Sequence, residues 1–466
     1  MYLRLPAGTG GTAARPHIRV IRPLLRHRRG GRSFAAVVGG LLLLGATLAE
    51  GATISKANNT NSLNKGNSWV GNNAPTSADT ALWGSAVTTA NTSAIGGNLS
   101  WLGIQITNPG GLVTINGTTN RTLTLGAGGI NMSAATQDLN LNAAIMLGAG
   151  QTWDVAANRM ITAAGVIGGA GRLTKAGAGT LTLTRANTFT GGLVINDGAV
   201  QFSSAANLGA SSGWVAVNGG TLQLLGGNTV TTARSHYLGG TSTLQVDTGS
   251  TLNLTGAVGN AISAGGSLVK TGAGTLVLSA TSGTTYGGVG HTTAVNGGTL
   301  QVSNDNLLGN AANTLSFNGG TLLLSGAFSS ARNVLMNGAG TINTNNNAVS
   351  LSGIVSGSGA LTKSGTGTLT LAGNNTFSGG TVVSGGSNST LSVGSAANLG
   401  SGAVTLTGGS ELLTTGTIGW SNGTVLGAQG GSLQGDGRTV SGRINTASGT
   451  TLTFSGTGIT EATAGN

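Results

Sequence analysis

The 466-residue sequence contains no cysteine, only 5 prolines, 7% charged residues and 3% aromatic residues. The lack of cysteine excludes a disulfide-stapled module, a metal site with cysteine ligands and an enzyme with a cysteine nucleophile. The scarcity of proline excludes collagen, which also needs glycine at every third position. A hydrophobic content of 38% is too high for a disordered chain. An ordinary globular domain is also disfavoured, because glycine supplies 87 residues.

The net charge of +11 at first suggests a nucleic-acid or membrane partner. However, eight of the 21 basic residues lie before position 33, and all ten acidic residues lie at Glu50 or later. From residue 50 onward the balance is 13 basic minus 10 acidic residues, or +3. We therefore expect no nucleic-acid partner.

A fifteen-residue apolar run, Phe34–Leu48, follows the basic stretch. It is shorter than the roughly 20 residues of a membrane-spanning helix and has the length of the hydrophobic region of a secretory signal. The sequence thus predicts a signal peptide at 1–49, cleaved after Ala49 or Gly51, with a retained N-terminal anchor as the alternative. After its removal we expect an exported chain without a transmembrane segment.

Three segments share one pattern, at 169–192, 265–288 and 357–380. They place Lys175, Lys270 and Lys363 at equivalent positions, 95 and 93 residues apart. Further blocks recur in the same order between them, such as Asn-Gly-Gly-Thr-Leu at 218–222 and 318–322. The chain therefore contains an internal repeat, which dominates the prediction of its fold.

Within each copy, apolar residues alternate over short stretches, as in Leu181-Thr182-Leu183 and Leu369-Thr370-Leu371. This period of two predicts short strands with one buried face, and the Gly-Gly and Asn-Gly pairs between them predict turns. Many short strands are also found in sandwiches and propellers, but propeller blades would show a tighter four-strand period and an aromatic signature in each blade. The composition favours an all-β β-solenoid with about three strands per coil, a thin aliphatic core and outward threonine, serine and asparagine.

The pattern G-x-G-x-L-T-K-x-G-x-G-T-L-T-L-x-x-x-N-T-F-x-G-G resembles the autotransporter-associated β-strand repeat of Gram-negative bacterial surface proteins. The first and third copies match at nearly every marked position. The middle copy departs, with Val269 in place of Thr and Thr284-Thr285-Tyr286 in place of Asn-Thr-Phe. The resemblance covers roughly residues 130–454.

The resemblance implies a right-handed parallel β-helix in the exported passenger of an autotransporter, acting as a stalk, adhesin or matrix component. It implies a secreted or cell-surface location associated with the outer membrane. An autotransporter also carries a C-terminal membrane barrel. Here the repeat pattern continues to Leu452-Thr453-Phe454 and no barrel follows in this sequence, so a truncated passenger of a larger autotransporter is a further alternative.

We predict a β-rich N-terminal cap region at 50–130 and the β-solenoid at 131–466. The cap region contains Trp69, Trp83 and Trp101, whose rings are expected to cover the open end of the first coil. A carbohydrate-stacking surface is the alternative for these three side chains.

The sequence contains few residues of the types that enzymes use for catalysis. Asp138 and Asp154 are the closest pair of acids in the sequence and the best candidates for the two carboxylates of a glycoside hydrolase. The acids are otherwise interpreted as turn residues, as in Asp197-Gly198 and Asp436-Gly437. His236 and His291 are too isolated for a zinc site. We therefore predict no catalytic residue, metal site or cofactor.

The repeated basic residues receive a structural interpretation. Lys175, Lys270 and Lys363 are expected to be solvated at strand ends, and Arg234 and Arg332 likewise. The sequence thus predicts a non-enzymatic surface β-solenoid for adhesion or matrix structure, with a carbohydrate-active β-helix protein as the alternative. Its expected partners are a surface polysaccharide or a host or neighbouring cell surface, with end-to-end self-association conceivable.

Overall fold

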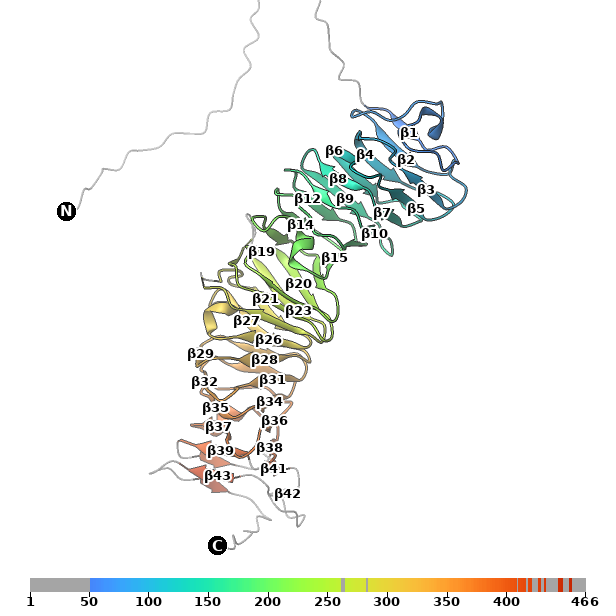
Figure 1. Ribbon diagram of the computed structural model, residues 1–466. Coiled ribbons are helices and arrows are strands. Elements are labelled where there is room, and N and C mark those ends of the chain that lie inside the picture. The colour runs from blue at the N-terminus through green and yellow to red at the C-terminus, as the bar shows by residue number, and fades with distance from the viewer. Residues whose placement is uncertain are drawn as a thin grey trace, which may run out of the picture. The chain divides into compact units, whose positions relative to one another are not determined.

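The structure is a computed structural model (Figure 1) that describes residues 51–260, 265–281, 284–408 and 410–415, and the backbone of five short strands between 418 and 454. The predicted signal peptide at 1–49 and Asp436 lie outside the described residues. Strands dominate the described chain. The exceptions are four short 3₁₀ helices, η1 (Gly66–Ser68), η2 (Ala205–Leu208), η3 (Asp305–Leu308) and η4 (Ala396–Leu399).

Most described strands belong to four long sheets, named here sheets 1 to 4. Sheet 1 contains twelve strands: β1 (Thr53–Ser55), β2 (Thr80–Trp83), β4 (Leu99–Ile106), β6 (Thr122–Met132), β8 (Ala144–Leu147), β9 (Gln151–Val155), β11 (Ile167–Gly168), β12 (Leu173–Ala176), β14 (Leu193–Ile195), β16 (Val215–Val217), β19 (His236–Leu238) and β22 (Val258–Asn260). Sheet 2 contains thirteen: β3 (Asn91–Ala94), β5 (Val113–Asn116), β7 (Leu139–Leu141), β10 (Met160–Ala163), β13 (Thr180–Leu183), β15 (Ala199–Phe202), β17 (Thr221–Leu224), β20 (Gly240–Val246), β23 (Gly266–Thr271), β25 (Thr292–Val295), β27 (Thr314–Phe317), β30 (Val334–Met336) and β33 (Val355–Gly357).

The other two long sheets hold the later coils. Sheet 3 contains eleven strands: β18 (Thr229–Thr232), β21 (Thr251–Leu254), β24 (Thr275–Leu278), β26 (Thr299–Val302), β28 (Thr321–Leu324), β31 (Gly340–Asn343), β34 (Leu361–Ser364), β36 (Thr381–Val383), β38 (Val404–Leu406), β41 (Leu426–Ala428) and β42 (Gly431–Ser432). Sheet 4 contains six: β29 (Phe328–Ser330), β32 (Asn347–Leu351), β35 (Gly367–Leu371), β37 (Ser389–Val393), β39 (Glu411–Thr414) and β43 (Arg443–Thr446). β40 (Ile418–Trp420) pairs with β44 (Leu452–Phe454).

The strands are stacked as a parallel β-solenoid of about 15 coils, which confirms the predicted fold class. Neighbouring strands of a sheet come from successive coils, as β13, β15, β17 and β20 do in sheet 2. Among the described strands, only β41 and β42 pair antiparallel. The chain therefore bonds mainly to the coils before and after it, as expected of a repeat protein.

The alternation of the sequence becomes two kinds of column. Inward residues stack in register, as Leu181, Val200, Leu222 and Leu244 do, and each of these four is 0% exposed. Outward residues form polar ladders. The longest consists of threonines on successive strands of sheet 3: Thr229, Thr251, Thr275, Thr299, Thr321, Thr341 and Thr362. Two short aliphatic columns per face, such as those through Leu222 and Leu224 of β17, fill so thin a core, which explains the scarcity of aromatic residues.

The N-terminal end of the stack is closed by a short segment that folds back on β1. Lys56 and Trp69 form an antiparallel bridge. Beside it, Val70 N–H donates to the Ser55 carbonyl and Ala57 N–H to the Ser68 carbonyl, both at 2.9 Å. This N-terminal fold-back (residues 56–70) occupies the outer edge of β1, which would otherwise expose unpaired backbone groups.

The three tryptophans of this region are inside the core. The Trp69 ring packs edge-on against the rings of Trp83 and Trp101, with 5.6 Å between ring centroids in each pair. All three side chains are at most 1% exposed, so they offer no face to a sugar. β6 runs across residue 130, the predicted end of the cap region, and strands on both sides of it pair within sheets 1 and 2.

Close packing between coils makes some glycines irreplaceable for steric reasons alone. A Cβ atom on Gly179 would lie 2.2 Å from the Ala156 carbonyl oxygen and 2.6 Å from that of Arg159, whereas one on Gly150 would meet no atom closer than 4.0 Å. We expect Gly179→Ala to lower the free energy of unfolding by about 2 kcal/mol or more. Gly150→Ala should change it by less than about 0.5 kcal/mol. Urea denaturation followed by circular dichroism measures both, and equal effects would contradict this packing.

Candidate functional site

The repeated lysines are buried, so the prediction that they are solvated is wrong. Lys175, Lys270 and Lys363 are each 0% exposed, and Lys56 near the N-terminus is too. The reason is the strand alternation itself, because each repeat lysine lies two residues after an inward leucine, as in Leu173-Thr174-Lys175. Its aliphatic stem therefore continues the core column, and its ammonium group reaches the corner of the coil.

Each ammonium group is enclosed by oxygen acceptors, an arrangement that we call a lysine cage. Lys175 Nζ donates to the carbonyl oxygens of Ala176 (2.8 Å), Gly177 (2.6 Å) and, on the next coil, Asp197 (3.3 Å). Lys270 Nζ repeats this pattern with Thr271 (2.8 Å), Gly272 (2.8 Å) and Gly297 (3.0 Å). One side chain thus joins two coils.

The third cage uses side-chain hydroxyls as well. Lys363 Nζ donates to Gly365 O, to Thr344 Oγ1 at 2.8 Å and to Ser389 Oγ at 2.9 Å. In all three copies the glycine two residues after the lysine has a positive φ, +69°, +73° and +71° in order. Only glycine adopts this conformation at no steric cost, and its carbonyl is then available to the ammonium group. The Lys-x-Gly part of the repeat is therefore one structural unit.

The cages occupy the ammonium groups, so the three lysines are not available for catalysis. Burial lowers the pKa of Lys175, Lys270 and Lys363 to about 8, so each is largely protonated at neutral pH. The charges of Asp197 and Asp154 partly oppose this shift at Lys175. An ammonium group has three donors, and the cage oxygens accept all three, so none of these lysines is placed to act as a base or a nucleophile.

The two repeated arginines are buried as well, so the prediction that they are solvated is also wrong. Arg234 and Arg332 are 5% and 4% exposed. Arg234 Nη2 donates to the carbonyl oxygens of Ala205 (2.9 Å) and Gly209 (2.8 Å), at the two ends of η2 on the preceding coil. Arg332 does the same for η3 through Gly309 (2.7 Å), and its Nε also bonds Asp305 Oδ1 at 2.8 Å. Both guanidinium groups therefore fasten one coil to the next.

Asp138 and Asp197 serve the fold. Asp138 Oδ1 accepts the Met160 N–H at 3.0 Å and lies 3.6 Å from Arg159 Nη1. Asp154 lies on β9 in sheet 1, whereas Asp138 precedes β7 in sheet 2. Asp197 Oδ1 accepts the N–H of Gly198 at 2.7 Å, as expected of a turn residue.

The two histidines differ in environment. His236 is buried in the core column between Val215 and Val258, with Nδ1 3.0 Å from the Arg234 carbonyl oxygen and no partner on Nε2. Burial lowers its pKa to about 4. His291 is half-buried beside Gly265. In the described ranges, no three His, Asp or Glu side chains gather as metal ligands would.

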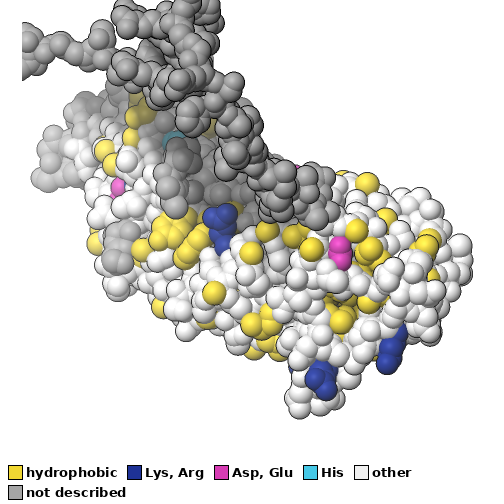
Figure 2. Space-filling view, turned by 90° about the horizontal axis from the view of Figure 1, so that it is seen from above, with side chains coloured by type: hydrophobic (Ala, Val, Ile, Leu, Met, Phe, Trp, Pro, Cys, Tyr) yellow, Lys and Arg dark blue, Asp and Glu magenta, His cyan; other side chains and the backbone are white. Residues whose placement is uncertain are grey.

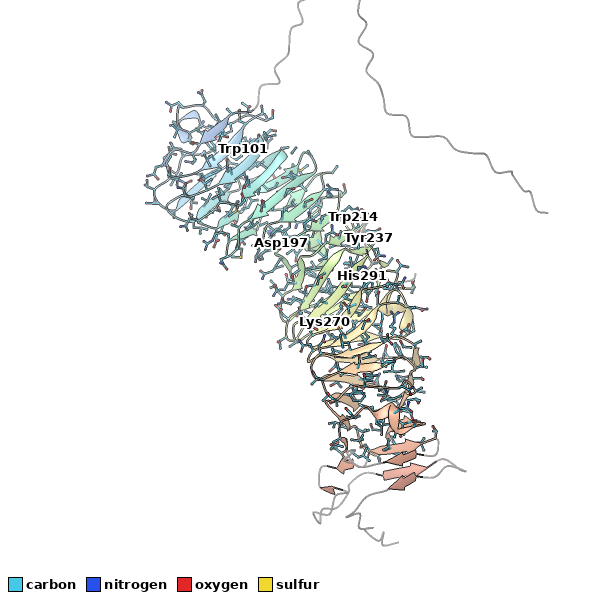
Figure 3. All side chains as sticks on the ribbon, turned by 180° about the vertical axis from the view of Figure 1, so that it is seen from behind. Trp101, Asp197, Trp214, Tyr237, Lys270 and His291 are labelled. Carbon is cyan, nitrogen blue, oxygen red and sulfur yellow. The ribbon has the colours of Figure 1, made fainter. Side chains whose placement is uncertain are left out.

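Two aromatic side chains are only half-buried, and they lie together. The ring centroids of Trp214 and Tyr237 are 6.0 Å apart, with their planes at 74°, on the outer face of sheet 1 (Figure 3). We call them the aromatic pair. The other described Trp, Tyr and Phe side chains are buried. Charged groups are sparse on the face seen in Figure 2.

The internal repeat shows that the fold does not need the aromatic pair. Register places Thr314 in the second copy and Ala403 in the third where the first copy has Trp214. Leu335 corresponds to Tyr237. These copies form the same parallel pairings with a small or aliphatic residue, so the aromatic pair is an addition to the repeat.

Comparison with known proteins identifies the repeat. The passenger-associated-transport-repeat matches residues 173–202, 268–302 and 361–387, which contain Lys175, Lys270 and Lys363 respectively. The chain therefore contains an autotransporter passenger β-repeat. A 148-residue stretch of the passenger is 38% identical to the adhesin BmaC autotransporter of Brucella suis biovar 1 (strain 1330), covering 30% of this chain and only 4% of that protein. No solved structure is significantly similar to the passenger.

The resemblance to autotransporter surface proteins is thereby confirmed, and the family implies a secreted, cell-surface protein. In the part of the passenger that the structure describes, no helix has the length and apolarity to cross a membrane.

The lysine cages predict a specific loss of stability. We expect Lys270→Met, which keeps the aliphatic stem but removes the donors, to lower the free energy of unfolding by about 2 kcal/mol or more, because buried carbonyls lose their partner. Lys65 is exposed, so Lys65→Met should change it by less than about 0.5 kcal/mol. Urea denaturation at pH 7 compares the two variants. Unchanged stability of Lys270→Met would refute the role of the cage.

His236 predicts sensitivity to acid. Its pKa is about 4 in the folded chain and about 6.5 when exposed, so between these values the unfolded chain binds more protons. The histidine's contribution to stability is therefore complete above pH 6.5 and is lost as the pH falls toward 4. His236→Val removes this dependence and introduces the residue that the second copy has at the equivalent position, Val334. Melting temperatures between pH 7 and 4 test it, and parallel profiles for the two proteins would contradict it.

Proposed function

We propose that this passenger is a non-enzymatic adhesive β-solenoid, which makes contact with a cell surface through side chains displayed on its coils. The observation that carries the proposal is the division of labour among its side chains. The buried lysines and arginines described above form hydrogen bonds between coils. The aromatic pair is partly exposed to solvent, and the fold does not require it.

Two further observations support adhesion over catalysis. The acids that the sequence offered as a catalytic pair are on different sheets, and Asp138 is held by Met160 and Arg159. In addition, the matched stretch of the Brucella protein belongs to a protein named as an adhesin. A rigid parallel scaffold suits adhesion, because it presents side chains at fixed spacing without the cost of ordering a flexible chain on contact.

The aromatic pair is the contact that we propose. Trp and Tyr are the residues most enriched at the centres of binding interfaces, because they bury a large apolar area while losing little conformational entropy. Trp214 lies over Gly192, where an added Cβ would come within 2.6 Å of the indole. The glycine therefore lets the indole lie close to the sheet, while the Trp214 side chain as a whole stays only half-buried.

The double variant Trp214→Thr/Tyr237→Leu tests the pair, since both new residues occur at the equivalent positions Thr314 and Leu335. Beads coated with the full chain are expected to be retained on epithelial monolayers or bacterial lawns. Retention should fall about tenfold or more in the double variant. Val70→Thr, a change at another apolar residue of the surface, should retain full binding.

The outcomes separate the parts of the proposal. Failure of the unaltered chain to adhere to either surface would overturn adhesion. Adhesion that is equal in the double variant would reject the aromatic pair as the contact. Release of reducing ends from a polysaccharide by the purified chain would contradict the non-enzymatic assignment.

A further inference from the structure

A groove of about 510 Å³ lies on the outer surface of the early coils, away from the core. We call it the arginine groove, because it contains Arg121 and Arg185 and no acidic residue. Its other lining residues are uncharged. They include Asn120, Asn142, Ala164 and Val166. Its volume lies within the range of about 300–1,000 Å³ that small-molecule sites occupy.

The groove follows the corner where the chain passes from sheet 2 to sheet 1 on four successive coils. These corners lie around residues 117, 142, 165 and 185, and backbone hydrogen bonds link them. Asn142 N–H bonds the Ile115 carbonyl at 2.9 Å, Ala164 N–H that of Leu141 at 2.9 Å, and Thr184 N–H that of Ala163 at 3.2 Å. With about 4.8 Å between coils, the four corners span about 14 Å. The arginines lie on its first and last coils.

Small residues form part of the floor of the groove. A Cβ on Gly165 would lie 1.9 Å from the Ala143 carbonyl oxygen, so packing between coils admits no side chain there. Its neighbour Ala164 is small, and Val166 is 41% exposed. The floor is therefore shallow and partly apolar, between two long basic side chains.

Neither arginine has a structural duty for its guanidinium group. Both are exposed, and within the described chain neither forms an ion pair or a side-chain hydrogen bond. At position 185 the fold depends on the backbone, because the Arg185 carbonyl oxygen accepts a hydrogen bond from Asn207 Nδ2 at 2.9 Å. In the third copy Gly373 accepts Asn398 Nδ2 in the same way, at 2.8 Å. The second copy has Ala280 there.

We propose that the arginine groove binds an anionic oligosaccharide, with Arg121 and Arg185 holding acidic groups of the sugar chain. Guanidinium groups bind carboxylate and sulfate oxygens through paired N–H donors. Asn120 has an amide side chain for sugar hydroxyls, and Val166 presents an apolar surface to the C–H face of a sugar ring. An elongated groove with a cation at each end matches a charged chain better than a single small anion.

Calorimetric titration of the full chain tests this site with three probes: a galacturonate tetrasaccharide, a heparin-derived tetrasaccharide and neutral maltotetraose. We expect binding of one or both anionic probes and none of maltotetraose. The stronger of the two anionic probes identifies the acidic group as a carboxylate or a sulfate. Affinity should decrease with added salt, since Coulomb attraction between exposed groups is screened.

Arg185→Ala and Arg121→Gln should each weaken binding by about tenfold or more. Arg185→Ala introduces the residue that the second copy already has, and circular dichroism verifies that the fold is retained. Arg172→Gln is the matched control, because Arg172 is exposed but does not line the groove, and its affinity should be unchanged.

Several results would overturn the assignment: no binding of either anionic probe, equal binding of maltotetraose, or equal loss in Arg172→Gln. The test uses soluble probes and leaves the aromatic pair intact. Its failure is therefore distinguishable from a failure of cell adhesion.

Discussion

Parallel pairing of each coil with the next is the constraint on which the rest of the structure depends. It fixes a spacing of about 4.8 Å between equivalent residues. Each side chain in a column must therefore pack against the equivalent side chains of the coils before and after it. The leucine stacks, the threonine ladder and the glycine corners all satisfy this one condition. The lysine cages extend it to the corners, where backbone carbonyls turn inward and a buried ammonium group supplies their donors.

Much of the fold could be predicted from the sequence, because its determinants are local. Alternation of Leu and Thr specifies a strand face, and Gly-Gly specifies a turn. The burial of Lys175 is the instructive failure. The same alternation placed it on the inner face with Leu173, but its charge argued for solvent. Its acceptor on Asp197 lies 22 residues away, on a coil whose register no local pattern specifies.

The aromatic pair and the arginine groove could not be predicted either, because each depends on the register between coils. Trp214 and Tyr237 are 23 residues apart in sequence numbering and meet only because β16 and β19 pair with Ala216 opposite Tyr237. The arginine groove is assembled from the corners of four coils. For Trp214, Tyr237 and Arg185 the signal in the sequence is a departure from the repeat: an aromatic or basic residue where another copy carries a small or aliphatic one. Arg121 precedes the repeat copies and gives no such signal.

The lysine cages also determine how the protein responds to its surroundings. Their partners are mostly uncharged dipoles fixed at hydrogen-bond distance, in contrast to the ion pairs Arg159–Asp138 and Arg332–Asp305. Mobile ions screen exposed charge pairs but have little access to buried dipoles. We expect a fold held in this way to change little in stability between dilute and concentrated salt, which suits the secreted, cell-surface location that the family implies.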